Sequence, residues 1–159
     1  MNKKLKHYME AVFKAWKAGR KLYLIFFDHC SLDELNKIPN GFNNNLIWNI
    51  GHAIVTQQKL IYKGSNLQGY ISDELFNKYQ SGTKPTVPVS QKEADELKSL
   101  LTSQIEQTIN DFQKGVFLTY NERTTGIGFH LTSVQDAFEC NNFHEGLHLG
   151  YMQSIRKFV

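Results

Sequence analysis

Four long stretches of this chain carry apolar residues at helical spacing, and this pattern restricts its fold more than any other feature. In the first stretch, Met9, Phe13 and Trp16 follow one another at intervals of four and three residues, which places them on one face of a helix. The pattern predicts helices over about 3–28, 46–63, 90–114 and from 132 nearly to the C-terminus. No region is rich enough in strand-forming residues to build a sheet, so the sequence favours an all-α fold.

Start and stop signals flank these helical stretches. Ser31 with Glu34, and Ser90 with Glu93, have the spacing of a capping box, in which a hydroxyl and a carboxylate bind the free backbone N–H groups of a helix start. Gly64 follows the second long stretch and is the expected residue at its C-terminal end, because glycine adopts the left-handed conformation that ends many helices.

Two long connections separate the helical stretches, over about 64–90 and 116–131. A short helix over 73–79 is possible in the first, and the second gives only weak support for a strand pair. Neither internal repeats nor low-complexity segments interrupt the pattern. We therefore expect an all-α four-helix bundle with two long connections, formed by a single domain over residues 1–159.

The composition excludes several classes of protein. Hydrophobic residues make up 41% and charged residues 21%, as in ordinary soluble globular domains. The net charge of +3 is small and its lysines and arginines are scattered, so nucleic acid is not an expected partner. We expect neither a membrane-spanning segment nor a signal peptide. Cys30 and Cys140 form no C-x-x-C motif, which favours buried reduced thiols and a cytoplasmic location.

The string His144-Glu145-Gly146-Leu147-His148 is the strongest chemical signal. Two histidines four residues apart lie on one face of a helix, one turn from each other, where they can bind one divalent metal ion. The string also matches the H-E-x-x-H pattern of zinc metalloproteases. Those enzymes need a third ligand, usually downstream, and residues 149–159 contain no His, Asp or Glu. A metalloprotease is therefore not expected.

A third metal ligand would have to come from an earlier part of the chain. The other histidines are His7, His29, His52 and His130. His52 stands out because it lies in an amphipathic helical pattern beside an isoleucine stripe, where it is expected to face the other helices. A histidine on a helix face is nevertheless more often an ordinary hydrogen-bonded residue than a ligand. The residues alone leave open both a three-histidine metal site and a metal-free bundle.

Two motifs together resemble those of the DinB-like (DinB/YfiT) superfamily of metal-binding four-helix bundles. The first is Trp48-Asn49-Ile50-Gly51-His52, and the second starts at His144 and runs through His148 to Tyr151. Chain length, helix order and the near-terminal position of the second motif agree, so the resemblance covers nearly the whole chain. Tyr151 departs from the family pattern, in which glutamine is frequent. The resemblance implies that His52, His144 and His148 bind one divalent ion, zinc or nickel.

The resemblance implies a function without fixing one activity. Some members resemble thiol-dependent S-transferases that use low-molecular-weight thiols, and others are known only as stress-associated proteins. We expect a metal-dependent enzyme acting on a small molecule, with thiol-dependent S-transfer favoured and metal-assisted hydrolysis second. The alternative is a non-catalytic metal-binding bundle that acts in a stress response or as an interaction protein. The resemblance also implies a homodimer paired through helix faces.

Four further residues are candidates for supporting roles. Glu145 is a candidate general base by analogy with H-E-x-x-H enzymes, although it is rotated by about 100° from the preceding histidine. A solvated or salt-bridged carboxylate is the alternative. Tyr151, three residues after the last histidine, is a second catalytic candidate. Asn49 and Asn141 lie at helical spacing from the histidines and are candidates for orienting the imidazoles, with ordinary packing as the alternative for each.

Overall fold

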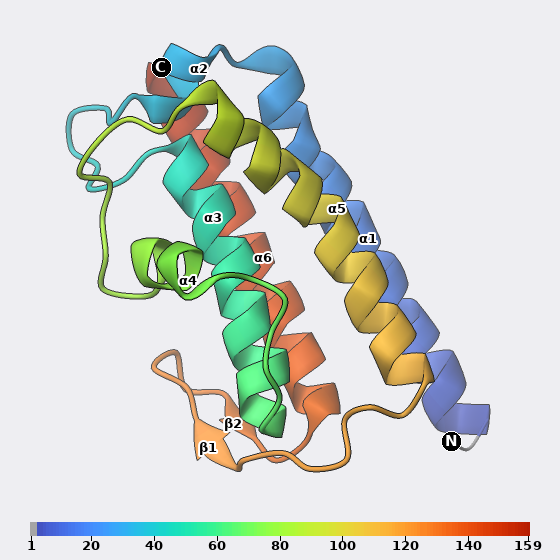
Figure 1. Cartoon of the computed structure of the whole chain (residues 1–159). Coiled ribbons are helices and arrows are strands. Elements are labelled where there is room, and N and C mark those ends of the chain that lie inside the picture. The colour runs from blue at the N-terminus through green and yellow to red at the C-terminus, as the bar shows by residue number, and fades with distance from the viewer. Residues whose placement is uncertain (1–2) are drawn as a thin grey trace.

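The computed structural model describes residues 3–159 and is mostly helical (Figure 1). The α-helices are α1 (Lys3–His29), α2 (Leu32–Asn36), α3 (Leu46–Gln57), α4 (Asp73–Tyr79), α5 (Gln91–Gln113) and α6 (Val134–Ile155). Shorter helical turns are the π-helical turn η1 (Gln58–Tyr62) and the 3-10 turns η2 (Lys63–Ser65) and η3 (Arg156–Phe158). The predicted all-α fold is confirmed. No helix within residues 3–159 is both long enough and apolar enough to cross a membrane.

The four long helices run alongside one another (Figure 1). Helix α1 packs against α5 and α6, and α3 packs against the same two helices, while the short α4 lies against α3. In the second long connection, β1 (Arg123–Thr124) and β2 (His130–Leu131) form an antiparallel pair, which contacts α6 through β2. The first connection therefore contacts α3 and the second contacts α6, the two helices that carry the histidine motifs.

The apolar stripe of α1 forms part of the interior, as its spacing predicts. Met9, Phe13 and Trp16 are all buried. The ring of Phe13 packs edge-on against Phe112 of α5 and Phe138 of α6, with ring centroids 5.4 and 5.2 Å away. Aromatic pairs of this kind contribute about 0.5–1.5 kcal/mol beyond the area they bury. These contacts hold α1, α5 and α6 together at one end of the molecule.

Side-chain caps begin the helices largely as predicted. The pattern at 31–34 forms a complete capping box at the start of α2. At the start of α5, the hydroxyl of Ser90 accepts a hydrogen bond from the backbone N–H of Glu93. The carboxylate of Glu93 does not complete that box, because it binds the side chains of Lys78 and Tyr79 instead. The Glu93 side chain, predicted to cap α5, thus connects α5 to α4.

The end of the second long helical segment differs from the prediction. Regular α-helix stops at Gln57, η1 and η2 follow, and Asn66 ends the segment with φ of 59°. Asparagine adopts this left-handed conformation more readily than most residues. The prediction that Gly64 ends the helix is therefore wrong. Gly64 instead makes room for the ring of Tyr120, since a Cβ there would lie 2.7 Å from that ring.

Gly51 and Gly19 provide a matched test of helix packing. A Cβ on Gly51 would lie 2.4 Å from the buried ring of Tyr79, whereas one on Gly19 would meet nothing within 4 Å. We predict that Gly51→Ala lowers the free energy of unfolding by about 1–3 kcal/mol through overpacking. Gly19→Ala should raise it by up to about 1 kcal/mol, because alanine favours the helix. Urea denaturation measures both, and a stabilising Gly51→Ala would contradict the tight contact between α3 and α4.

Candidate metal centre

Helices α3 and α6 bring three histidines together. His52 lies on α3, and His144 and His148 lie one turn apart on α6. Their ring centroids are separated by 5.1, 4.8 and 4.4 Å, and one ring nitrogen from each lies within 4.8 Å of the other two. Within residues 3–159, no other set of three His, Cys, Asp or Glu residues comes this close. A single divalent ion would therefore have three nitrogen ligands within reach.

The backbone and an aromatic ring hold His52 in one orientation. Its Nδ1 lies 2.7 Å from the backbone oxygen of Tyr79, and because a carbonyl only accepts, Nδ1 carries the proton. The indole of Trp48 stacks on the imidazole at a centroid distance of 4.8 Å and an angle of 8°. The Nε2 atom, 3.3 Å from the hydroxyl of Thr56, keeps its lone pair. Metal-binding histidines are commonly oriented by such a hydrogen bond from the other ring nitrogen.

Asn49 orients His148 in a similar way. The amide oxygen of Asn49 lies 2.7 Å from Nδ1 of His148. The amide nitrogen of Asn49 donates to the backbone oxygen of Asn45 at 2.7 Å and to the side-chain oxygen of Asn44 at 3.1 Å. These two bonds fix which end of the amide faces the imidazole, so Asn49 accepts and Nδ1 of His148 donates. The Nε2 lone pair of His148 is then left for a ligand.

His144 has a different environment from the other two histidines. Its Nδ1 is buried and has no hydrogen-bond partner among the described residues. Leaving a buried polar atom without a partner costs about 1–3 kcal/mol, which a bound ion would offset by binding the imidazole. This orphaned nitrogen and the all-imidazole donor set fit a divalent transition-metal ion.

All three imidazoles are held in the neutral form that binds metals. Burial, then the neighbouring His148 and His52, lowers the pKa of His144 to about 3. Burial and the neighbouring His52 lower the pKa of His148 to about 4. The pKa of His52 is also lowered, mainly by burial. At neutral pH, proton competition therefore does not oppose metal binding at this site.

A pocket of about 340 Å³ opens beside His52 and His144, within the usual size range of small-molecule sites. Its walls come from α3, η1, the chain around β1 and α6, and they include Lys59, Arg123 and Cys140. None of the described residues that line it is Asp or Glu. The arrangement provides space for a small molecule beside two of the three histidines.

Glu145 lies in the core rather than in this pocket. Its carboxylate forms an ion pair with Arg20 at 2.8 Å and accepts hydrogen bonds from Trp16 Nε1 and Asn141 Nδ2, each at 2.9 Å. The backbone oxygen of Glu145 accepts from the hydroxyl of Tyr23 at 2.7 Å. These contacts tie α6 to α1. They support the salt-bridged alternative for Glu145, whose role as a general base stays a prediction.

Tyr151 and Asn141, the two remaining candidates, form no hydrogen bond with an imidazole among the described residues. Tyr151 packs edge-on against Phe42 with ring centroids 5.5 Å apart and does not line the pocket. Asn141 donates to Glu145, and its own side-chain oxygen is buried without a partner in the described part of the chain. The other histidines also lie outside the three-histidine group: His7, His29 and His130.

Sequence reasoning missed the polar network around Glu145. Arg20 donates to the side-chain oxygen of Gln57 on α3 at 2.9 Å, and Gln57 donates to the hydroxyl of Thr108 on α5 at 2.8 Å. One hydrogen-bonded network therefore joins all four long helices. The sequence does hold a signal for it, because Arg20 lies four residues after Trp16 on the apolar stripe of α1, and a buried arginine requires an acidic partner.

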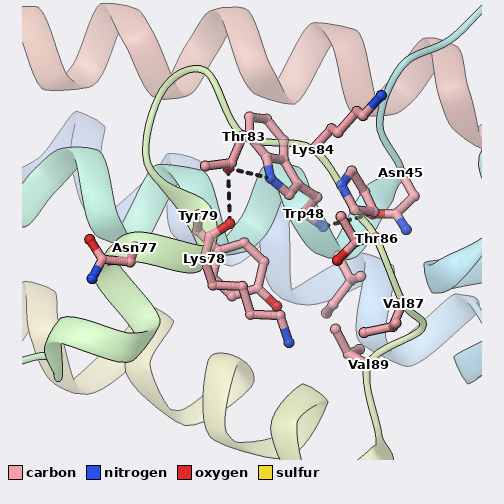
Figure 2. Close-up of a pocket in the computed structure, with 12 residues that line it drawn as sticks. Asn45, Trp48, Asn77, Lys78, Tyr79, Thr83, Lys84, Thr86, Val87 and Val89 are labelled. Carbon is pink, nitrogen blue, oxygen red and sulfur yellow. Dashed lines mark hydrogen bonds between the residues drawn. The ribbon is translucent and has the colours of Figure 1, made fainter.

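A second cavity, of about 220 Å³, adjoins the histidine group through shared side chains (Figure 2). Trp48 and Tyr79, which both contact His52, form part of its wall. Figure 2 shows the indole of Trp48 pointing toward Thr83, whose hydroxyl accepts from the indole nitrogen at 3.1 Å and lies 2.9 Å from the backbone oxygen of Lys78. The segment after α4 thus supports the aromatic ring that stacks on His52.

The fold and the histidine group agree with a comparison to known families. The family profile described as the DinB superfamily matches residues 15–152, a span that contains all three histidines. This match covers most of the chain, which therefore belongs to the DinB superfamily. A search of curated proteins gave no match.

The core ion pair gives a stability prediction. Arg20→Leu would leave the buried Glu145 carboxylate without its cation, and we expect the free energy of unfolding to fall by about 3–5 kcal/mol. As a control, Lys98→Ala breaks the exposed pair with Asp28, whose atoms are 3.0 Å apart, and should cost less than about 1 kcal/mol. Guanidinium denaturation of both variants measures the difference. Similar losses in the two variants would contradict a central role for the buried pair.

Proposed function

We propose that this protein is a DinB-like four-helix bundle that binds one divalent ion, zinc or nickel, through His52, His144 and His148. We further propose that it acts as a metal-dependent enzyme on a small molecule. The observation that carries the proposal is the convergence of three neutral imidazoles beside an open pocket. Structural zinc sites have four protein ligands, whereas catalytic sites keep one position open. No fourth His, Cys, Asp or Glu joins the group within the described residues.

Thiol-dependent S-transfer is the chemistry we favour. A bound divalent ion supplies Lewis acidity, which favours the thiolate form of a thiol that coordinates it. The protein's own Cys140 is a poor source of that thiolate, because burial in the pocket wall raises its pKa. We therefore assign the reacting thiol to a low-molecular-weight thiol that enters the pocket. The hydrogen bonds that His52 and His148 donate to Tyr79 and Asn49 would keep the imidazoles fixed while it binds.

Metal-assisted hydrolysis is the second candidate. The open coordination position would serve hydrolysis as well, since bound water is acidified by a metal ion. Hydrolytic H-E-x-x-H sites, however, use the glutamate as a general base. Here Glu145 is paired with Arg20 in the core, and no carboxylate lines the pocket within residues 3–159. The pocket therefore favours a reaction that needs no carboxylate base.

The metal site makes a prediction about composition and activity. The purified protein should contain about one zinc or nickel ion per chain, and His52→Ala should lose most of it because only two ligands remain. His29→Ala, which removes an exposed histidine outside the group, should keep it. Elemental analysis measures the metal content. Conjugation of a small thiol to an aryl halide, followed spectrophotometrically, should require the metal and should be lost in His52→Ala.

Two outcomes of these measurements would change the proposal in different ways. Unchanged metal content in His52→Ala would overturn the ligand assignment. A full metal content without turnover of any thiol or hydrolytic substrate would instead support the non-catalytic metal-binding alternative.

The hydrogen bond from His148 to Asn49 makes a separate prediction. Removing an outer partner of a metal-binding histidine typically weakens metal affinity about 10–100-fold, and we expect that loss for Asn49→Ala. Asn142→Ala is the matched control, because Asn142 lies on α6 and donates to the backbone oxygen of Val12 at 3.0 Å rather than to an imidazole. Competition with a zinc-binding dye measures both affinities. Equal affinities for the two variants would show that Asn49 does not position His148.

A further inference from the structure

The pocket beside the histidines carries two positively charged side chains without acidic partners. Lys59 of η1 and Arg123 of β1 both line it, and each is half-buried. Neither forms an ion pair among the described residues. Glu122, which precedes Arg123 in the chain, lies 3.2 Å from His130 instead. The pocket therefore has a positive charge that the protein does not neutralise.

Arg123 brings a positive charge to the wall of the pocket. Its Nε atom is buried and has no hydrogen-bond partner within residues 3–159. Burial raises the pKa of both Cys140 and Tyr120, and the Arg123 guanidinium is the largest charge that acts in the opposite direction on each. The positive charge is thus close to the buried Cys140 and the half-buried Tyr120. A buried donor without a partner is unfavourable, so the protein holds the Arg123 guanidinium here at a cost, beside the pocket that its side chain lines.

We propose that the pocket binds small molecules that carry an anionic group, a carboxylate or a phosphate, and that Arg123 and Lys59 bind this group. The reacting part of the molecule would then face His52 and His144. This inference rests on the proposed metal-dependent function and narrows its substrate class. The guanidinium offers a planar pair of donors that matches two oxygens of a carboxylate or phosphate. With no carboxylate among its described lining residues, the pocket offers nothing to attract a cationic substrate.

A pair of thiols that differ in one charge tests the proposal on the metal-loaded protein. Isothermal titration compares 3-mercaptopropionate with its uncharged amide, 3-mercaptopropionamide. We expect the carboxylate to bind about tenfold more tightly, as one charge-assisted hydrogen bond predicts. Arg123→Gln should abolish most of this preference, whereas Arg123→Lys should keep part of it because the charge remains. Lys92→Gln, which removes an exposed charge outside the pocket, should leave the preference unchanged.

The outcomes separate this proposal from the metal site. Elemental analysis first checks that wild type and each variant keep their metal. If they do, two results would overturn the anionic substrate class and leave the metal site intact. One is that wild type does not prefer the carboxylate over the amide, and the other is that Arg123→Gln has the same preference as wild type. Thermal unfolding of Arg123→Gln checks that β1 and its neighbours remain folded. Retention of the preference in Arg123→Lys would separate loss of charge from loss of structure.

A second measurement does not need the metal. The Nε–H signal of Arg123 in nitrogen-15 NMR spectra reports on the surroundings of its guanidinium group. In metal-free protein we expect it to shift saturably with propionate or inorganic phosphate, and not with propionamide. The tighter of the two anions identifies the ligand group as a carboxylate or a phosphate. Absence of a shift with both anions would overturn the proposal even if the protein binds zinc.

Discussion

The ion pair between Arg20 and Glu145 determines which way α6 is rotated about its own axis. Arg20 and Trp16 of α1 hold the Glu145 carboxylate in the core. Successive residues of a helix are about 100° apart, so anchoring Glu145 toward α1 turns His144 and His148 toward α3. Glu145 of the H-E-x-x-H string thus contributes to the site by setting the orientation of the helix that carries the two histidines. The network continues to α3 and α5 through Gln57 and Thr108, which links the helix that carries His144 and His148 to the other three long helices.

The segment between α3 and α5 supplies the second constraint on the site. The backbone oxygen of Tyr79, at the end of α4, orients His52. Helix α4 is itself held to α5 by Glu93, which binds Lys78 and Tyr79, and to α3 by the close approach of the Tyr79 ring to Gly51. A stretch that joins two long helices therefore places one of the hydrogen-bond acceptors that the histidine group needs. A substitution that unfolds α4 is therefore expected to disturb the orientation of His52 without changing any of the three histidines.

Sequence patterns predicted the features that depend on residues close together in the chain. Helix positions, the caps at Ser31 and Ser90, and the shared face of His144 and His148 all follow from residues close together in the chain. The end of the second long helical segment could not be predicted from local residues. Gly64 is there because the ring of Tyr120, which lies far away in the sequence, packs against it. The burial of Glu145 and the entry of Arg123 into the pocket likewise depend on distant segments. Such tertiary contacts leave no periodic pattern in the sequence. Arg20 is an exception, because an arginine on an apolar stripe indicates a buried acidic partner.

The proposed function depends on one divalent ion that three imidazoles share, with one coordination position left open. The most direct test is anomalous diffraction from crystals of the zinc-loaded protein, recorded on both sides of the zinc absorption edge. We expect a single strong peak about 2.0–2.1 Å from one nitrogen of each of His52, His144 and His148, with the fourth ligand coming from solvent. A peak elsewhere, no peak at the three histidines, or a fourth ligand supplied by the protein would contradict it.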